Sequence, residues 1–117
     1  MRRGRVEDAG GEVLLPEVGR TTSAWERGRG LLGRPALTPG QGLWIDRCGS
    51  VHTWGMRYAL DVVFMTGEGV ILKVARSLRP FRFAAARKAR MVLELPAGTP
   101  MARDLLPGRA LRWRELP

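Results

Sequence analysis

The stretch CGSVHTWGM, residues 48–56, holds the only cysteine and the only histidine of this 117-residue chain, and one of its four tryptophans. Cys48, His52 and Met56 follow one another at intervals of four residues, and each side chain can bind a soft metal ion. Three kinds of site are open to such a segment: a metal centre, a Cys–His nucleophile, or the wall of an apolar pocket. The secondary structure that carries the three side chains decides between them.

We expect a strand with loop ends here, because Val51, Thr53 and Trp54 favour strands and glycines stand nearby. At about 3.3 Å per residue, Cys48 and His52 would lie about 13 Å apart, too far to share an ion or a proton. Zinc would also need three or four protein ligands at about 2 Å. The sequence therefore predicts no metal and no cofactor, and a Cys48 that serves as a small buried residue.

Two acidic residues stand inside apolar runs, Asp61 in ALDVVFM and Glu94 in MVLELP. A buried acid is costly unless it finds partners. Both acids therefore act as structural hydrogen-bond anchors, or they form a polar ligand-binding pocket with His52, walled by Trp54 and Met56. The pocket would bind a small ligand or a protein partner that the sequence does not identify.

An enzymatic alternative uses the same residues: a small hydrolase with His52 as the base and Asp61 orienting it. The chain carries no glycine-rich phosphate loop, no paired-carboxylate motif and no serine elbow. We therefore favour a non-catalytic accessory module over an enzyme.

The positive charge of the chain is concentrated in its second half. The net charge is +9, and residues 71–117 carry eleven basic and three acidic residues. No acid interrupts residues 73–90, where Phe81 and Phe83 alternate with arginines as on a platform for single-stranded nucleic acid. Signatures of nucleic-acid modules are missing, so specific binding is not expected. A third alternative is weak, nonspecific binding of nucleic acid or another anionic partner by a loop cluster of Arg79, Arg82, Arg87 and Lys88.

These residues need a scaffold, and the pattern of the chain predicts one. Residues 1–11 are polar and are expected to be flexible, and residues 12–117 to form one β-rich domain with a first strand near residues 12–15. From residue 42 onward, short runs rich in Val, Leu and Trp alternate with Gly and Pro, and TGEG at 66–69 predicts a hairpin turn. The predicted class is α+β and β-dominated: a small antiparallel, barrel-like sheet, closed or nearly closed because closure removes exposed edges.

Two helices are expected beside this sheet. Ser23 and Glu26 form a capping box that begins a helix over residues 23–33, which packs on the sheet. Thr99 and Pro100 begin a short second helix that ends near residue 106. The first helix would end at Gly33 and Pro35, with a buried face of Ala24, Trp25, Gly28, Leu31 and Leu32.

No segment reaches the roughly 18 apolar residues of a transmembrane helix, and none has the apolar run of a signal peptide, about 7–15 residues. We therefore expect a cytoplasmic protein without membrane insertion.

The succession of TTSAWERGRGLLGR, HTWGMRYALDVVFMTGEGVILKV, LRPF, LELPAG and PGRAL resembles the domain-of-unknown-function 192 family, also called uncharacterised protein family 0127. The resemblance extends from about residue 12 to the end. It implies a small β-rich domain of a kind that bacteria often secrete or anchor to membranes, with no settled activity. This chain departs from the pattern by lacking a signal segment, and by Pro107, Gly108 and Arg109 in place of the usual Gly-Asp pair.

Overall fold

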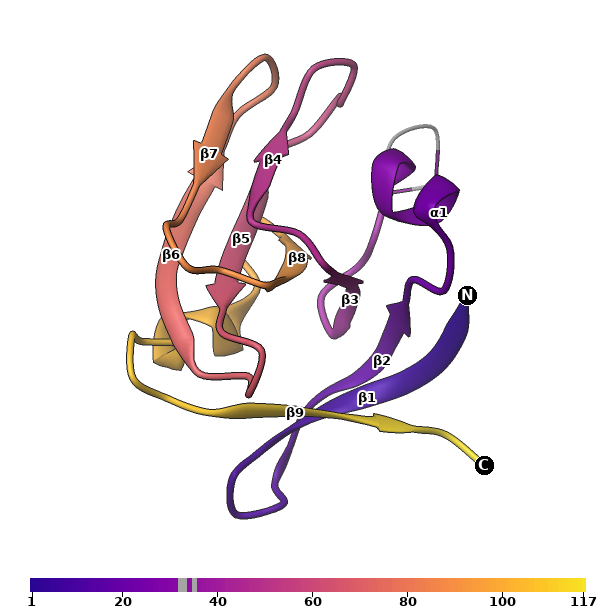
Figure 1. The fold of residues 1–117 in the computed structure, drawn as a ribbon, viewed down its shortest axis with the longest axis vertical. Helices are drawn as coiled ribbons and strands as arrows, with labels where there is room; N and C mark the ends of the chain where they lie inside the picture. The colour runs from indigo at the N-terminus through magenta and orange to yellow at the C-terminus, as the bar shows by residue number, and fades with distance from the viewer. Residues whose placement is uncertain (32–33, 35) are drawn as a thin grey trace.

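Strands dominate the fold, as the short valine- and leucine-rich runs predict (Figure 1). The computed structural model describes residues 1–31, 34 and 36–117. Its strands are β1 (Arg2–Asp8), β2 (Val13–Arg20), β3 (Gln41–Asp46), β4 (Ser50–His52), β5 (Leu60–Met65), β6 (Ile71–Leu78), β7 (Phe83–Ala85), β8 (Met91–Pro96) and β9 (Leu111–Glu115). Among these residues, seven strands form one sheet in the order β6-β5-β8-β3-β2-β1-β9, and β4 pairs with β7.

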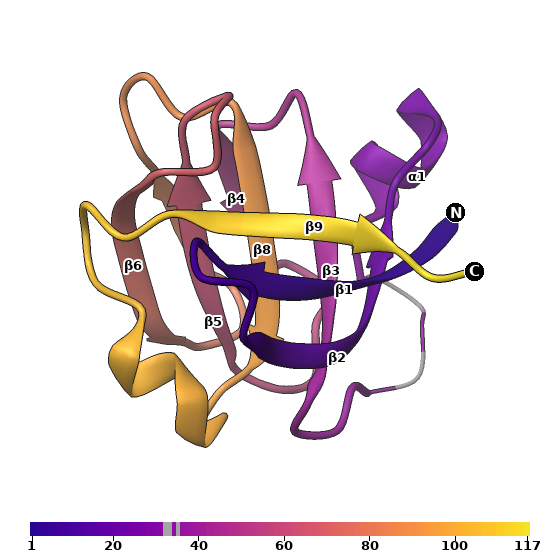
Figure 2. The same cartoon turned by 90° about the horizontal axis from the view of Figure 1, so that it is seen from below.

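The large sheet changes direction between β2 and β3. In Figure 2, β9, β1 and β2 run across the strands β6, β5, β8 and β3 that lie behind them. β2 and β3 are parallel, with Val18 opposite Gly42, whereas the other neighbouring pairs of this sheet are antiparallel. A parallel pair needs a long connection, and the segment between Arg20 and Gln41 supplies it. That connection lies beside the pocket described below.

The sheet is not closed into a barrel, which corrects the expectation of a closed or nearly closed barrel-like sheet. The edge strands β6 and β9 approach each other around one isolated bridge, between Val70 and Ala110. From there β9 continues along β1, from Asp8 opposite Leu111 to Gly4 opposite Glu115. Beside this bridge the N–H of Ile71 donates to the carbonyl of Arg109 at 2.8 Å, but among the described residues the pairing does not continue into a ladder between β6 and β9.

A paired strand replaces the flexible segment that was expected over residues 1–11. β1 lies between β2 and β9, and its Val6 is fully buried. A Cβ on Gly4 would lie 2.3 Å from the ring of Trp113, so glycine allows β9 to pack closely against β1. The sequence RRGRVED is poor in strand-forming residues, and its partner β9 comes from the far end of the chain.

The central strands β5 and β8 are buried on both faces, so the sheet separates two hydrophobic cores. Successive residues of a strand point to opposite faces. The first core contains alternate residues of these strands, Val63, Met65, Leu93 and Leu95. The second core contains the intervening ones, Leu60, Val62, Phe64 and Val92. Burying a side chain as large as Phe64 contributes roughly 1.5–3 kcal/mol, so both faces hold the strands in place.

The first helical segment, α1 (Ala24–Arg29), is shorter than the helix expected over residues 23–33. Ser23 caps it as predicted, because its hydroxyl accepts a hydrogen bond from the backbone N–H of Glu26 at 3.1 Å. No residue of α1 is buried, and Trp25 is 74% exposed, so the expected apolar face is wrong for the helix itself. The chain leaves the helix at Gly30, with φ 53°, and only then buries Leu31. Leu32, Gly33 and Pro35, also assigned to that helix and its end, lie outside the described residues.

The second segment, η1 (Pro100–Asp104), is a 3-10 helix with Pro100 in its first turn. Thr99 does not cap it with its side chain; its hydroxyl donates instead to the carbonyl of Pro96 at 2.7 Å. The predicted turn at residues 66–69 joins β5 to β6, and Gly69 adopts a positive φ of 86° there. No helix in the described parts of the chain has the length and apolar character to cross a membrane.

Candidate functional site

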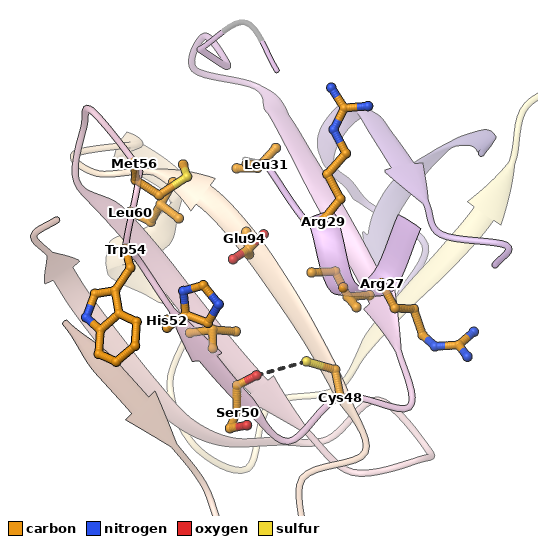
Figure 3. A pocket seen from close by; sticks show the side chains of 14 residues that line it. Arg27, Arg29, Leu31, Cys48, Ser50, His52, Trp54, Met56, Leu60 and Glu94 are labelled. Carbon is orange, nitrogen blue, oxygen red and sulfur yellow. Dashed lines mark hydrogen bonds between the residues drawn. The ribbon is translucent and has the colours of Figure 1, made fainter. Parts of the chain in front are cut away.

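A half-open pocket of about 270 Å³ lies over the second core, between α1 and the β4–β5 region (Figure 3). Glu94 of β8 lies near its centre in this view, with His52 and Met56 to the left and Leu31 above. The guanidinium groups of Arg27 and Arg29 point away from Glu94. The lining consists of Arg27, Gly28, Arg29, Gly30, Leu31, Ile45, Cys48, Ser50, Val51, His52, Trp54, Met56, Leu60 and Glu94.

Glu94 is the most unusual residue of this pocket. β8 places it opposite Leu43 of β3 and Val62 of β5, on the face of the second core. Its side chain is 5% exposed, and its Oε1 atom has no hydrogen-bond partner among the described residues. Burial away from water disfavours the charged carboxylate and raises the pKa of Glu94 to about 7. Near neutral pH the group therefore exists in both forms, one that donates a hydrogen bond and one that only accepts.

Gly30 brings the chain close to this carboxyl group. A Cβ on Gly30 would lie 3.2 Å from Oε1 of Glu94, and its φ of 53° is a conformation that side chains disfavour. Glycine at this position therefore lets the end of α1 pass beside Glu94. Gly28, which was expected on the buried face of the helix, also lines the pocket, but no atom lies within 4 Å of its Cβ position.

Tyr58 and Cys48 lie within electrostatic range of Glu94. Burial, with a smaller contribution from the Glu94 charge, raises the pKa of the Tyr58 phenol. The Tyr58 hydroxyl is buried and, like Oε1 of Glu94, has no protein partner among the described residues. Burial also raises the pKa of the Cys48 thiol, whose Sγ donates to the carbonyl of Ser50 at 3.1 Å. The reactive thiolate is therefore disfavoured at Cys48, which is opposite to what a catalytic cysteine needs.

The segment 48–56 contributes one side of the pocket. β4 ends at His52, and Trp54 and Met56 follow it in the turn before β5, so the pocket brings together Cys48, His52 and Met56. His52 and Trp54 are exposed, with ring centroids 5.6 Å apart, whereas Met56 is buried. Within the described residues, no three His, Cys, Asp or Glu side chains gather in a way that could hold a metal ion.

Thr53 fixes the position of this turn, and sequence analysis missed it. Its hydroxyl donates to the carbonyl of Arg79 and accepts from the N–H of Arg82 at 2.9 Å. Its backbone accepts from the N–H of Phe81 and donates to the carbonyl of Arg82. Thr53 is fully buried, so these bonds tie the β4–β5 turn to the β6–β7 loop and orient Trp54 at the mouth. A threonine between two exposed ring residues gives no sequence signal of this role.

Asp61 does not belong to the pocket, which corrects its assignment to a site shared with His52 and Glu94. In the β5–β8 ladder Asp61 stands opposite Leu95, whereas Glu94 stands opposite Val62. These adjacent positions direct the two acids to opposite faces of the sheet. The Oδ1 atom of Asp61 accepts a hydrogen bond from the backbone N–H of Ser77 at 2.8 Å. Asp61 is thus a structural anchor, and the His52–Asp61 pair of the hydrolase alternative is not assembled.

The four residues of the predicted basic surface, Arg79, Arg82, Arg87 and Lys88, are exposed. They lie on the β6–β7 and β7–β8 connections, and β7 itself interrupts the loop that was expected beyond Pro80. None of the four forms a salt bridge with a described acidic residue. Phe81 and Phe83 are 68% and 66% exposed beside them, so they do not pack inward.

Comparison with known proteins found similar solved structures and a matching family. No curated protein matches the chain. The fold is similar to that of a crystallised protein from Sinorhizobium meliloti 1021, with a TM-score of 0.78, 26% identity, and coverage of 96% of this chain and 92% of the other. It is also similar to a protein of unknown function from Novosphingobium aromaticivorans DSM 12444, with a TM-score of 0.74, 22% identity, and coverage of 95% and 84%.

The model of the DUF192 family, described as uncharacterized ACR, matches residues 5–113. This match agrees with the family resemblance that was inferred from HTWGMRYALDVVFMTGEGVILKV, LELPAG and the other quoted stretches. It also extends the matched region to β1. Because the match covers nearly the whole chain, the protein belongs to the DUF192 family.

Proposed function

We propose that this protein is a non-catalytic ligand-binding module whose pocket uses Glu94 as its polar anchor. One observation carries the proposal: Oε1 of Glu94 is buried at the pocket and has no hydrogen-bond partner among the described residues. An unpaired buried polar atom costs about 1–3 kcal/mol. A ligand that pairs with it recovers this energy, which gives the pocket a preference for molecules with a hydrogen-bonding head.

The surroundings of Glu94 restrict the ligand further. The volume of about 270 Å³ is slightly smaller than that of typical ligand pockets, which span about 300–1,000 Å³. Ile45, Val51, Met56 and Leu60 supply apolar lining, and Trp54 and His52 supply exposed rings at the mouth. The ligand is therefore a small molecule with an apolar body and one polar head that reaches Glu94.

Binding explains the residues better than hydrolysis does. A hydrolase of the predicted kind needs an acid that orients His52, and Asp61 faces the first core instead. Cys48 has a raised pKa and donates its thiol hydrogen to a backbone carbonyl, so it is a poor nucleophile. The remaining polar group, Glu94, suits recognition because its carboxyl can donate or accept near neutral pH.

The test is a screen of small amides, amines and alcohols by ligand-observed NMR with the wild-type protein, Glu94→Gln and the exposed control Glu12→Gln. We expect amine hits whose signals are lost with Glu94→Gln and kept with Glu12→Gln. A neutral acceptor head can still bind the glutamine N–H, so for such a head the expected change in Glu94→Gln is the loss of its pH dependence. The pH dependence identifies the head group. A cationic head binds more tightly as pH rises through about 7, because it needs the carboxylate, and an acceptor head binds more tightly as pH falls. Amine hits that bind Glu94→Gln as well as wild type, or neutral hits whose binding to wild type does not change with pH around 7, contradict the proposal.

A second candidate function rests on the basic surface. Arg79, Arg82, Arg87 and Lys88 lack acidic partners among the described residues, and Phe81 and Phe83 are exposed beside them. These features support weak binding of an anionic partner. Such binding is dominated by the attraction of opposite charges, and its affinity falls as the salt concentration rises. The S. meliloti relative is provisionally named a transcription regulator, but this chain offers no feature that reads a base sequence.

Titration of labelled single-stranded DNA at low and physiological salt tests this second candidate. We expect weak binding that disappears at physiological salt and when the four basic residues are changed to Glu. Submicromolar affinity that survives physiological salt would show that the surface is a dedicated nucleic-acid site.

A further inference from the structure

A second hollow, of about 530 Å³, lies at the carboxyl ends of β2 and β3 and at the start of β8. The parallel pairing of β2 with β3 brings Arg20 and Asp46 to the same edge, and the antiparallel pairing of β3 with β8 places Asp46 opposite Met91. The only acidic residue in the lining of this hollow is Asp46. Four arginines line it as well: Arg20, Arg27, Arg47 and Arg90.

The charge of Arg20 is already neutralised. Its Nε and Nη2 atoms each donate to one carboxylate oxygen of Asp46, both at 2.7 Å. Its guanidinium also lies over the rings of Trp44 and Trp113, at 5.8 and 5.3 Å from their centroids. The charge of Asp46 is thus balanced by Arg20, and no other described arginine forms a salt bridge with this acid.

Arg27, Arg47 and Arg90 have no acidic partner within salt-bridge distance among the described residues. Glu26, next to Arg27 in α1, is engaged by the N-terminal ammonium at 2.9 Å and by the Thr22 hydroxyl at 2.8 Å. Three uncompensated guanidinium groups around one hollow repel each other, and a bound anion removes this repulsion.

The backbone fixes two of these arginines side by side. The N–H of Cys48, directly after Arg47, donates to the carbonyl of Arg90 at 3.0 Å. Arg47 itself has a φ of 50°, a strained conformation for a residue other than glycine. The chain therefore holds Arg47 in a costly geometry at the place where it borders the hollow.

We propose that this hollow binds the phosphate group of a ligand through Arg27, Arg47 and Arg90. A phosphate group offers three oxygens and up to two negative charges, which suits three guanidinium groups, whereas a carboxylate has two oxygens and one charge. This site goes beyond the proposed ligand pocket and stands without it, because Arg47 and Arg90 do not line the pocket of Glu94.

Calorimetric and NMR titration with inorganic phosphate and with glycerol 3-phosphate at low salt tests the proposal, with acetate for comparison. We expect saturable phosphate binding that is about tenfold weaker in Arg47→Gln and in Arg90→Gln, the loss of one charge-assisted hydrogen bond. Arg112→Gln removes the same charge from an exposed position on β9, outside the hollow, and leaves the affinity unchanged. Equal weakening in all three variants, or phosphate binding no tighter than acetate binding, overturns the proposal.

Two further measurements complete the test. In the wild-type protein, phosphate shifts the amide signals of Arg47, Gly67 and Arg90; shifts spread over the whole basic surface contradict a defined site. Sedimentation with phosphatidylcholine vesicles, with and without phosphatidic acid, distinguishes a lipid phosphate from a soluble one. If the wild-type protein sediments with the vesicles that contain phosphatidic acid and Arg47→Gln does not, the ligand is a lipid phosphate. If the wild-type protein does not sediment with these vesicles, the ligand is soluble. Glu94→Gln leaves phosphate affinity unchanged, so a failed ligand pocket is not mistaken for a failed phosphate site.

Discussion

Replacing Glu94 by glutamine is expected to change how the stability of this protein depends on pH. In the folded protein the pKa of Glu94 is about 7, because burial disfavours its charged form, whereas the ordinary value is 4.5. Between these two values the folded state keeps the proton and the unfolded state has lost it. The free energy of unfolding therefore falls as pH rises from about 4.5 to about 7, and is constant with respect to this group outside that window.

The size of the effect follows from the difference between the two pKa values. Each unit corresponds to about 1.4 kcal/mol, so ionisation of Glu94 in the folded state removes about 3 kcal/mol of stability. Glutamine has nearly the same shape and no charge. We expect Glu94→Gln to gain about 3 kcal/mol relative to wild type between pH 4 and pH 8, or about 10 °C in melting temperature.

Urea unfolding of both proteins at a series of pH values gives this difference directly, because every other titrating group cancels in the comparison. A ¹³C NMR titration of the Glu94 carboxyl group should have its midpoint near pH 7. The exposed Glu12→Gln serves as control and should show no change with pH of this size. A constant difference between wild type and Glu94→Gln at all pH values would refute the reasoning, since it would mean that the carboxyl group has the same pKa in the folded and unfolded states.

Three other substitutions, one of them with a matched control, test the scaffold and the segment 48–56. Asp61→Ala should lower the free energy of unfolding by about 1–3 kcal/mol in urea titration, because it leaves the Ser77 N–H without its acceptor; a loss of hydrolytic activity without a loss of stability would restore the catalytic alternative. Gly69→Ala should lower the free energy of unfolding by about 2–4 kcal/mol, since Gly69 has a positive φ and its Cβ would lie 2.3 Å from the Leu111 carbonyl oxygen. Gly67→Ala in the same turn has open space around its Cβ and should change the free energy of unfolding little. Cys48→Ser should fold with a nearly unchanged melting temperature, and the wild-type thiol should react slowly with a disulfide reagent at pH 7, because its pKa is raised.

The sequence predicted the features of this fold that depend on neighbouring residues. The run Leu60–Met65 is a strand, the turn at 66–69 follows it, and Ser23 caps α1. Features that depend on distant pairing were missed. β1 is held by β9 from the other end of the chain, and the parallel pairing of β2 with β3 depends on a long connection. Neither contact leaves a local pattern, because strand pairing is decided by which faces and edges remain to be covered.

The same limit applies to the site. Segment 48–56 was recognised from its residue types, and the structure brings His52, Trp54 and Met56 to one pocket with Glu94. The distance argument that separated Cys48 from His52 assumed one continuous strand, whereas β4 begins only at Ser50. The roles of Gly30 and Thr53 could not be predicted from the sequence. Gly30 matters because it lies close to Glu94, and Thr53 because it forms hydrogen bonds with the β6–β7 loop.

Asp61 and Glu94 show how one sequence signal leads to two physical outcomes. Each is a single acid in a buried strand, and each is at most 5% exposed. Asp61 faces the first core and accepts the backbone N–H of Ser77, a residue whose φ of 52° is unusual, so the acid stabilises a bend in the neighbouring strand. Glu94 faces the second core, where Oε1 finds no partner among the described residues. A fold under selection for stability alone would replace such an acid by an apolar residue. Under the proposed function, a ligand that completes the hydrogen bonds of Glu94 offsets this cost, whereas the carboxylate of Asp61 is already paired within the protein.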